Sequence, residues 1–512
     1  MGSYRYLRRV QSAGRLGPAV ALTTIALAAT LSCASAAARV PTARQPVARQ
    51  TIDPSIHLAD VSAGKGGFII NGTTVKYASS GTSVAGAGDV NGDGLDDLIV
   101  GVPGEGSGGG WRAGATYVVF GKPGTEPFNL DRIAAGQGGG FVIRGEGVNR
   151  NSGTSVAAAG DVNGDGLADI LIGVGQLFGS PEPEDRSYVV FGKADTAPVE
   201  LSAVAAGQGG GFAIHGISPN DVQSFSVAAA GDFNGDGLSD VAVGVLHRSY
   251  DLKQECCYVV FGKADTAQVE LSAVAQGAGG VAIKGEAHWG AANIAGAGDF
   301  NGDGLADLVV GMPEMDDRMG RSYVVFGRHG TTQIDLAQVS AGEGGFRLDG
   351  AAHYDVSGSV VATAGDMNGD GLADVLITAP GDSQRYGRWA QGVTYVIFGH
   401  KTTEPVALFD IERGLGKGFA IYGESIRYDY SGRGAVSIGD MNGDGLSDLL
   451  IGAPGADADN VYAGGRSYIV YGKADTANID LRSVTGGPLP ASRSWARPST
   501  AAWAAPSARR AT

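Results

Sequence analysis

The sequence predicts an all-β fold, a β-propeller of four-stranded antiparallel blades. Three observations predict it: a nine-residue motif recurs six times, short apolar runs flank each copy, and glycine supplies 86 of the 512 residues. Glycine at more than twice its usual share, without the Gly-x-y register of collagen, indicates many tight turns between short strands. The hydrophobic share of 43% is too high for a disordered chain.

The recurring motif is Asp-x-Asn-Gly-Asp-Gly-Leu-x-Asp. Its six copies lie 67 to 74 residues apart and start at Asp89, Asp161, Asp232, Asp299, Asp366 and Asp440. Self-similarity at a fixed period is typical of repeat architectures, in which each unit buries its apolar surface against its neighbours. The length of the chain therefore reflects repetition of one unit rather than a series of different domains.

Each repeat contains four candidate strands, which we call A, B, C and D. Strand A is a small apolar stretch before the motif (Ser155–Ala159 in the second copy), and strand B is the aliphatic run after it (Asp97–Val100 in the first). After a variable loop, strand C is a Tyr-Val-Val-Phe-Gly segment such as Tyr117–Gly121, and strand D a Gly-Gly-Phe-x-Ile-x-Gly segment such as Gly139–Gly145. These runs are short, rich in β-branched residues and bounded by turn residues, which indicates strands. Four such strands per unit are typical of a propeller blade, whereas one coil of a solenoid would be shorter.

The sequence leaves the closure of the ring open. Six sets of A, B and C strands are accompanied by six D-type strands, of which the first, Gly66–Gly72, precedes the first A strand. Six closed blades, with this N-terminal strand completing the last sheet, would balance the count. However, the linker that leads into each D strand, as in Val199–Val204, begins again at Ile479–Val484 and runs into Gly487-Pro488-Leu489-Pro490. A seventh blade lost through a frame change is therefore the competing hypothesis, with a disordered Ala/Pro/Ser/Arg tail at 485–512.

The N-terminal residues have the features of a secretory signal. A basic front with arginines at 5, 8, 9 and 15 precedes an apolar run over 16–31, and small residues stand at 34–36. We predict a signal peptide at 1–36, a linker at 37–55, a propeller at 56–484 and a secreted protein without a membrane span. An uncleaved anchor and a lipoprotein attached through Cys33 are the alternatives.

The charge of the chain is acidic. The formal net charge of −15 becomes −19 when the four arginines of the predicted signal are removed. This balance argues against nucleic acid as a partner, because nucleic-acid binding requires a basic face, and it favours bound cations.

The residues that end each C strand carry a resemblance to a known family. They are Phe120-Gly121, Phe191-Gly192, Phe261-Gly262, Phe326-Gly327, Phe398-Gly399 and Tyr471-Gly472. After strand B, Gly452-Ala453-Pro454 has variants such as Gly101-Val102-Pro103, while the second and third copies depart from the pattern. The chain resembles the FG-GAP repeat family, the β-propeller of integrin α chains and of related bacterial exported proteins. The resemblance implies a ring that in the family usually has seven blades.

The recurring motif has the donor set of a calcium loop. Positions 1, 5 and 9 are carboxylates, position 3 is an amide, and glycines at positions 4 and 6 let the chain curl. Ca²⁺ takes six to eight oxygen ligands, whereas Mg²⁺ demands stricter geometry. An EF-hand or dockerin loop would need an acidic residue at position 12 and a helix after the loop. That position is excluded as a ligand because it is aliphatic in every copy: Val100, Ile172, Val243, Val310, Ile377 and Ile451. A metal-free hairpin is the alternative, although its converging carboxylates would repel one another.

The resemblance to the integrin-like calcium loop implies that positions 1, 3, 5, 7 and 9 bind about six Ca²⁺ ions, position 7 through its backbone carbonyl. We expect these ions to hold the A–B hairpins and to take no part in catalysis. The implied ligands are Asp89, Asn91, Asp93, Leu95, Asp97, Asp161, Asn163, Asp165, Leu167, Asp169, Asp232, Asn234, Asp236, Leu238, Asp240, Asp299, Asn301, Asp303, Leu305, Asp307, Asp366, Asn368, Asp370, Leu372, Asp374, Asp440, Asn442, Asp444, Leu446 and Asp448.

The motifs of catalysis that we sought are missing from the sequence. The seven histidines are scattered without zinc-binding spacing, and no nucleophile elbow occurs. Alternating strand direction places the A–B and C–D loops at one face of the ring and the B–C and D–A loops at the other. The second face carries candidate ligand-binding aromatics, namely Trp111, Trp289, Tyr354, Trp389 and Tyr428.

Two classes of function follow from the resemblance. In integrins the corresponding face meets ligand or partner subunit, so we expect an extracellular binding or adhesion module for a protein or polysaccharide. A propeller associated with a hydrolase, lyase or phospholipase is the alternative. Cys256 and Cys257 open a C strand, where other copies have Arg-Ser or Ala-Thr. They are interpreted as small strand residues, with a vicinal disulfide or a reactive thiol left open.

Overall fold

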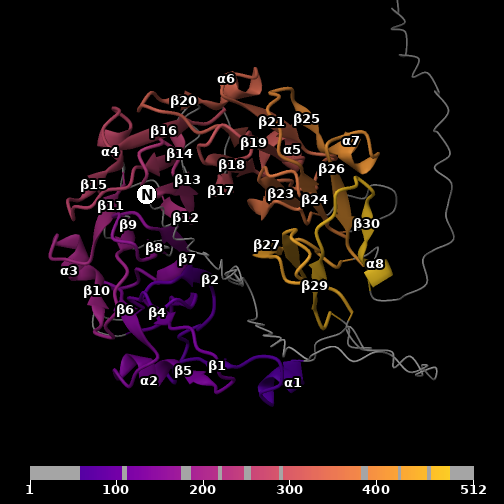
Figure 1. The fold of residues 1–512 in the computed structure, drawn as a ribbon. Coiled ribbons are helices and arrows are strands. Elements are labelled where there is room, and N and C mark those ends of the chain that lie inside the picture. The colour runs from indigo at the N-terminus through magenta and orange to yellow at the C-terminus, as the bar shows by residue number, and fades with distance from the viewer. Residues whose placement is uncertain are drawn as a thin grey trace, which may run out of the picture.

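The computed structural model describes residues 58–106, 112–174, 186–216, 222–246, 255–286, 292–381, 390–424, 428–457 and 463–484. The predicted signal peptide, linker and tail lie outside these residues. The chain forms a six-bladed β-propeller whose blades follow one another around a common centre, from indigo to yellow in Figure 1. The predicted fold class is therefore confirmed.

Each blade is a sheet whose first strand, A, lies nearest the centre. The A, B and C strands of the first three blades are β2 (Val84–Gly88), β3 (Asp97–Val102) and β4 (Ala115–Val119); β7 (Ser152–Gly160), β8 (Asp169–Val174) and β9 (Arg186–Val190); and β12 (Val222–Gly231), β13 (Asp240–Leu246) and β14 (Glu255–Val260). Those of the last three are β17 (Asn293–Gly298), β18 (Asp307–Met312) and β19 (Arg321–Val325); β22 (Val361–Gly365), β23 (Asp374–Ala379) and β24 (Val393–Ile397); and β27 (Gly434–Gly439), β28 (Asp448–Ala453) and β29 (Arg466–Val470).

The first five blades each add an antiparallel D strand beside strand C. These strands are β6 (Gly140–Arg144), β11 (Gly211–His215), β16 (Gly280–Lys284), β21 (Gly345–Asp349) and β26 (Gly418–Tyr422). Within the described residues the sixth blade has only three strands. The D-type strand that precedes the first blade, β1 (Ile70–Asn71), pairs in parallel with β5 and not with β29. The hypothesis that this strand completes the last sheet is therefore wrong for this structure.

A short parallel strand, which the sequence did not predict, joins each repeat to the preceding one. Each lies in the linker after a C strand, pairs with the D-type strand of the previous repeat, and leads into a helix of about one turn. The strands are β5 (Phe128–Asn129), β10 (Val199–Glu200), β15 (Val269–Glu270), β20 (Ile334–Asp335), β25 (Val406–Ala407) and β30 (Ile479–Asp480). The helices are α2 (Leu130–Ala134), α3 (Leu201–Ala205), α4 (Leu271–Val274), α6 (Leu336–Ser340), α7 (Leu408–Glu412) and α8 (Leu481–Val484). Each helix buries its first leucine completely, which anchors the linker to the blade.

Two further helices complete the described chain. They are α1 (Leu58–Ser62), before β1, and α5 (Met315–Arg318), in the B–C connection of the fourth blade. No helix within the described ranges has the length and apolar character needed to cross a membrane.

The core of the propeller lies between the blades. Five apolar clusters each combine side chains from two successive blades, as Ile143 of β6 does with Ile172 of β8. A sixth cluster covers the outward face of the first blade, where Phe68 and Ile70 of the N-terminal segment pack over Tyr117 and Val100. Both faces of a blade are apolar, so a blade is stable only where each face has a neighbour.

The cysteine pair lies in the core between the third and fourth blades. A bulge at the start of β14 lets both side chains enter the same apolar cluster. Cys256 and Cys257 are free thiols with their Sγ atoms 3.3 Å apart. The interpretation as small buried strand residues agrees with this placement.

Candidate metal loops

The six predicted metal loops connect strands A and B of every blade, at one face of the ring. The glycine before each loop allows the chain to turn from the end of strand A into the loop. Gly88 has a φ of 73° at a bulge in β2, and a Cβ there would come within 2.9 Å of the Ala168 Cβ in the next blade. Glycine is therefore required where the A strand ends, because a side chain would be strained and would clash.

The first aspartate of each loop organises the turn. In the first loop Asp89 Oδ1 accepts hydrogen bonds from the N–H groups of Gly92 and Asp93, at 2.8 and 3.0 Å. Asp89 Oδ2 accepts from Gly94 N–H at 2.8 Å. The same three bonds recur in the other five loops, around Asp161, Asp232, Asp299, Asp366 and Asp440.

The third and fifth residues bring more oxygens into the same short turn. Asn91 Oδ1 accepts from Asp93 N–H at 2.8 Å, and Asp93 Oδ1 accepts from Leu95 N–H at 2.9 Å. The Asn91 side-chain amide also donates to Asp93 Oδ2 at 3.0 Å. Positions 1, 3 and 5 therefore lie within hydrogen-bonding reach of one another. The side-chain atoms that they could offer to a metal ion are the oxygens of two carboxylates and of one amide.

The ninth residue is buried and bonds to a distant part of the same blade. Asp97 Oδ2 accepts from Val90 N–H at 2.9 Å, and Asp97 Oδ1 accepts from the N–H of Gly121 at 2.8 Å. Gly121 is the glycine of the Phe-Gly pair after strand C. All six blades repeat the bond, with Gly192, Gly262, Gly327, Gly399 and Gly472 as the other donors. The two recurring features of the repeat, the loop and the Phe-Gly pair, are thus parts of one hydrogen-bonded unit.

Burial makes these ninth carboxylates hard to ionise in the absence of a cation. Removal from water raises the pKa of Asp97 to about 6, and neighbouring loop carboxylates add to the rise against the opposing effect of the backbone hydrogen bonds. The same causes raise the pKa of Asp169, Asp240, Asp307 and Asp374 to about 7. A cation nearby would reverse this effect by favouring the charged form.

Successive loops are also joined to each other. The N–H of Ala168, at position 8 of the second loop, donates to the carbonyl of Asp89, at position 1 of the first, at 3.0 Å. Equivalent bonds of 2.9 to 3.1 Å run from Ser239, Ala306, Ala373 and Ser447 to the first residue of the preceding loop. The leucine at position 7 also lies over the neighbouring loop: a Cβ on Gly92 would stand 3.0 Å from Leu167 Cδ2. The loops therefore form a continuous chain from the first blade to the sixth.

The loops fit a cation by the chemistry of their donors. Within the described residues, no three His, Cys, Asp or Glu side chains are gathered tightly enough to hold a metal ion as they stand. Instead the first aspartate of each loop faces backbone N–H groups. The donor set is nonetheless the one that Ca²⁺ prefers, with carboxylate, amide and carbonyl oxygens and no nitrogen or sulfur ligand.

The opposite face of the ring carries the described members of the candidate ligand set. Tyr354 and Tyr428 lie on D–A connections and are 58% and 43% exposed. The Tyr428 ring is 6.3 Å from that of Tyr430. Trp111, Trp289 and Trp389 lie outside the described residues, so the set as a whole stays a prediction.

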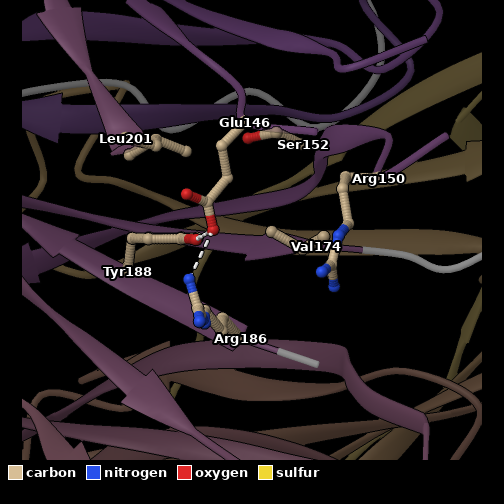
Figure 2. Close-up of a pocket in the computed structure, with 7 residues that line it drawn as sticks. All are labelled: Glu146, Arg150, Ser152, Val174, Arg186, Tyr188 and Leu201. Carbon is tan, nitrogen blue, oxygen red and sulfur yellow. Dashed lines mark hydrogen bonds and ion pairs between the residues drawn. The ribbon is translucent and has the colours of Figure 1, made fainter. Parts of the chain in front are cut away.

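Sequence reasoning missed a repeated polar cluster at this second face. Figure 2 shows one copy, in a small pocket between the first and second blades, where Arg186 and Tyr188 of β9 both reach Glu146. The Arg186 Nη1–Glu146 Oε1 distance is 2.8 Å. The sequence pattern that could have revealed this cluster is a Gly-Glu pair after a D strand followed by Arg-Ser-Tyr in the next C strand.

The same cluster recurs at two more junctions. Glu286 pairs with Arg321 between the third and fourth blades, and Glu424 pairs with Arg466 between the fifth and sixth, each at 2.7 Å. These side chains are about four-fifths buried and join neighbouring blades. We therefore assign the ion pairs a structural role at the junctions between blades.

Comparison with known proteins agrees with this geometry. The FG-GAP repeat family model matches residues 80–119, 152–190, 225–248, 291–324, 357–397 and 433–470. Relatives include phosphatidylinositol-glycan-specific phospholipase D of Rattus norvegicus, 32% identical over 145 residues, or 28% of this chain and 16% of the relative. Integrin alpha-5 of Xenopus laevis is 30% identical over 182 residues, 33% of this chain and 15% of the relative. Integrin alpha-V of Gallus gallus is 28% identical over 238 residues, 46% of this chain and 20% of the relative.

The matched part covers no more than a fifth of any of these three relatives. The family match nevertheless falls on all six repeats, and each matched segment contains the A–B loop or the strands beside it. The chain therefore belongs to the FG-GAP repeat proteins and is a β-propeller of the integrin α-like type.

Proposed function

We propose that each of the six A–B loops binds one Ca²⁺ ion. The observation that carries the proposal is the repeated oxygen-only donor set, held in the same hydrogen-bonded turn in all six blades. The ligands would be the side chains at positions 1, 3, 5 and 9 and the backbone carbonyl at position 7. The ion supplies positive charge among three carboxylates, which removes their mutual repulsion and favours ionisation of the buried ninth residue.

The role of the ions is structural. Each loop is joined to the next by a backbone hydrogen bond and to its own Phe-Gly turn by the ninth aspartate. An ion that stiffens one loop therefore stabilises its own A–B hairpin and the adjacent blade. Binding to the folded state alone raises the free energy of unfolding by mass action.

Titration calorimetry of the chelator-stripped protein with CaCl₂ tests calcium binding, with MgCl₂ as the comparison ion. We expect several sites per chain and weaker binding of Mg²⁺. The sharpest variant is Asp165→Asn, which removes one exposed carboxylate without changing its size, and it should remove one site. A matched control is Asp195→Asn, an exposed aspartate outside the loops. Absence of calcium heat in the wild type would refute the proposal.

We further propose that the protein is a secreted binding or adhesion module whose ligand, an extracellular protein or polysaccharide, binds the B–C and D–A loop face. Support comes from the integrin α relatives, from exposed Tyr354 and Tyr428 on that face, and from the signal-like N-terminal sequence. The relative named as a phospholipase D keeps a second candidate open, a propeller that accompanies a hydrolase, lyase or phospholipase.

A glycan and protein array with and without Ca²⁺, run beside a panel of hydrolase and lyase substrates, separates the two candidates. We expect array binding that a Tyr354→Ala, Tyr428→Ala double variant loses while its calcium binding is retained. Turnover of a panel substrate without array binding would favour the enzyme.

A further inference from the structure

The sixth blade has an unpaired strand at its outer edge. The C strands β4, β9, β14, β19 and β24 each pair with a D strand on the side away from strand B. The sixth C strand, β29, pairs with β28 alone among the described strands. Its free edge therefore presents unpaired backbone groups, which can pair with an added strand.

The same blade leaves an apolar face uncovered. Leu376 and Val396 of the fifth blade are fully buried against the sixth. Their counterparts one repeat later, Leu450 and Ile469, are only partly buried. The sheet thus keeps the apolar pattern of a blade with a neighbour, although no described residue covers it.

The absent D strand accounts for one exposed aromatic. In four of the other five blades the Phe of the Phe-Gly pair contacts the Phe of the D strand edge to face, as Phe398 contacts Phe419 at 5.9 Å between ring centroids. Phe398 is 8% exposed, whereas its counterpart Tyr471 is 56% exposed. Tyr471 therefore marks the place of a missing partner ring.

None of the described D-type strands is free to fill the place. The D strands of the first five blades are held on both sides, by strand C and by the parallel linker strand. The N-terminal strand β1 is held by β5, and its Phe68 and Ile70 pack on the first blade. The sequence at 485–512 contains no Gly-Gly-Phe segment.

We propose that the free edge of β29 binds an extended β-strand donated by a different protein. The D strand of the fifth blade, which is the neighbour of the open blade, supplies the pattern for the donor. In the fifth blade Phe419 lies opposite Val396, Ala420 opposite Tyr395 and Ile421 opposite Thr394. By the same register, a donor Phe lies opposite Ile469 and beside Tyr471, a small residue lies opposite Tyr468, and an aliphatic residue lies opposite Ser467.

The donor also needs a glycine before its Phe. Gly418 occupies this place in the fifth blade with a φ of 149°, and a Cβ there would come within 2.0 Å of the Val396 carbonyl oxygen. The surface therefore selects an extended Gly-Phe-small-aliphatic segment. This is recognition by strand addition, in which backbone bonds give affinity and alternate side chains give specificity.

A synthetic peptide with the sequence of Lys417–Glu424, labelled with fluorescein, is a direct probe because it carries a D strand of this chain. We expect saturable binding to the full chain by fluorescence anisotropy, and slower hydrogen exchange confined to β29 and its neighbours. A peptide with Asp in place of its Phe should bind at least tenfold more weakly. Lack of saturable binding by the first peptide overturns the proposal.

The matched protein variants are Ile469→Lys at the free edge and Leu415→Lys at another exposed apolar position, since Leu415 is 66% exposed. Circular dichroism and melting show whether each is folded. Peptide binding should fall at least tenfold in Ile469→Lys and stay unchanged in Leu415→Lys, and an equal affinity in both contradicts the proposal.

Two measurements test whether something other than a different protein occupies the edge of β29. A dimer mass in sedimentation would mean that a second copy covers β29. A disulfide within one chain of an Ile70→Cys, Ser467→Cys variant would mean that β1 closes the ring. Either result overturns donation by a different protein, whereas a monomer without that disulfide supports it.

Discussion

The first and sixth blades are both at an end of the ring, but only one of them has a covered outward face. On the first blade Phe68 and Ile70 lie over the sheet, and Tyr117 beneath them is fully buried. On the sixth blade Leu450 and Ile469 stay partly exposed. The difference teaches that a blade need not have a whole neighbour: one D-type strand and its adjoining residues are enough to bury an end face.

The largest expected effect is that of calcium removal, and it should be uneven along the ring. A site held at a hundred times its Kd contributes about 2.7 kcal/mol to the free energy of unfolding, so chelation should lower the melting temperature strongly. The first and sixth loops are each linked to a neighbour on one side only, within the described residues. Hydrogen exchange in chelator should therefore rise first at Asp89–Asp97 and Asp440–Asp448. An unchanged calorimetric midpoint would refute a structural role for the ions.

The next effect is the pH dependence of the calcium-free protein. Four of the ninth aspartates, Asp169, Asp240, Asp307 and Asp374, have a folded pKa of about 7 against an ordinary value of 3.8, so the folded state holds their protons more tightly. Stability should then increase as pH falls from about 7 to about 4, and be lost as pH rises through 7. Melting in calcium-free buffer at several pH values checks this.

The sixth blade should also differ from the fifth in this pH dependence. Burial raises the pKa of Asp448 by less than that of Asp374, because no described residue covers the outer face of the sixth blade. Asp374→Asn should flatten the pH profile of melting more than Asp448→Asn does. Equal flattening would mean that the open face does not affect the loop.

A pair of equivalent core positions gives the third test. Val396→Asp places a charge between two blades and should cost about 4 kcal/mol or more, whereas Ile469→Asp, at the same register on the open face, should cost about 1 kcal/mol or less. Urea unfolding followed by circular dichroism measures both. Comparable costs would mean that the face of the sixth blade is covered in solution.

The smallest expected effect concerns the aromatic side chains at the two ends. Phe68 meets Phe128 edge to face at 5.4 Å, so Phe68→Ala should cost about 2 kcal/mol. Tyr471→Ala should change stability by about 0.5 kcal/mol or less, since its ring is mostly exposed. A reversed order of the two would contradict the assignment of β1 as the cover of the first blade.

Much of the fold and site could be predicted because the information is local. The motif starting at Asp89 contains its own turn residues and oxygen donors within nine positions, and glycines permit the curl. The strands on both sides follow from short β-branched runs. The placement of the loops and of Tyr354 at opposite faces follows from strand parity alone.

Other features could not be predicted because they join distant residues. Asp97 and Gly121 meet across a B–C connection of variable length, so no fixed spacing reveals the bond. The parallel strands such as β10 are two residues long and depend on a D strand more than fifty residues earlier. The proximity of the two thiols of Cys256 and Cys257 results from a bulge.

The sequence by itself therefore determined the number of repeats, the strands within each and the chemistry of the loops, since these depend on contiguous residues. Only the tertiary structure decided how the ring ends. A closure in which the N-terminal strand completes the last sheet balanced the strand count, but β1 gains a parallel partner in β5 and a packed surface on the first blade. Because that apolar burial holds β1 at the first blade, the outer edge of β29 has no partner among the described strands.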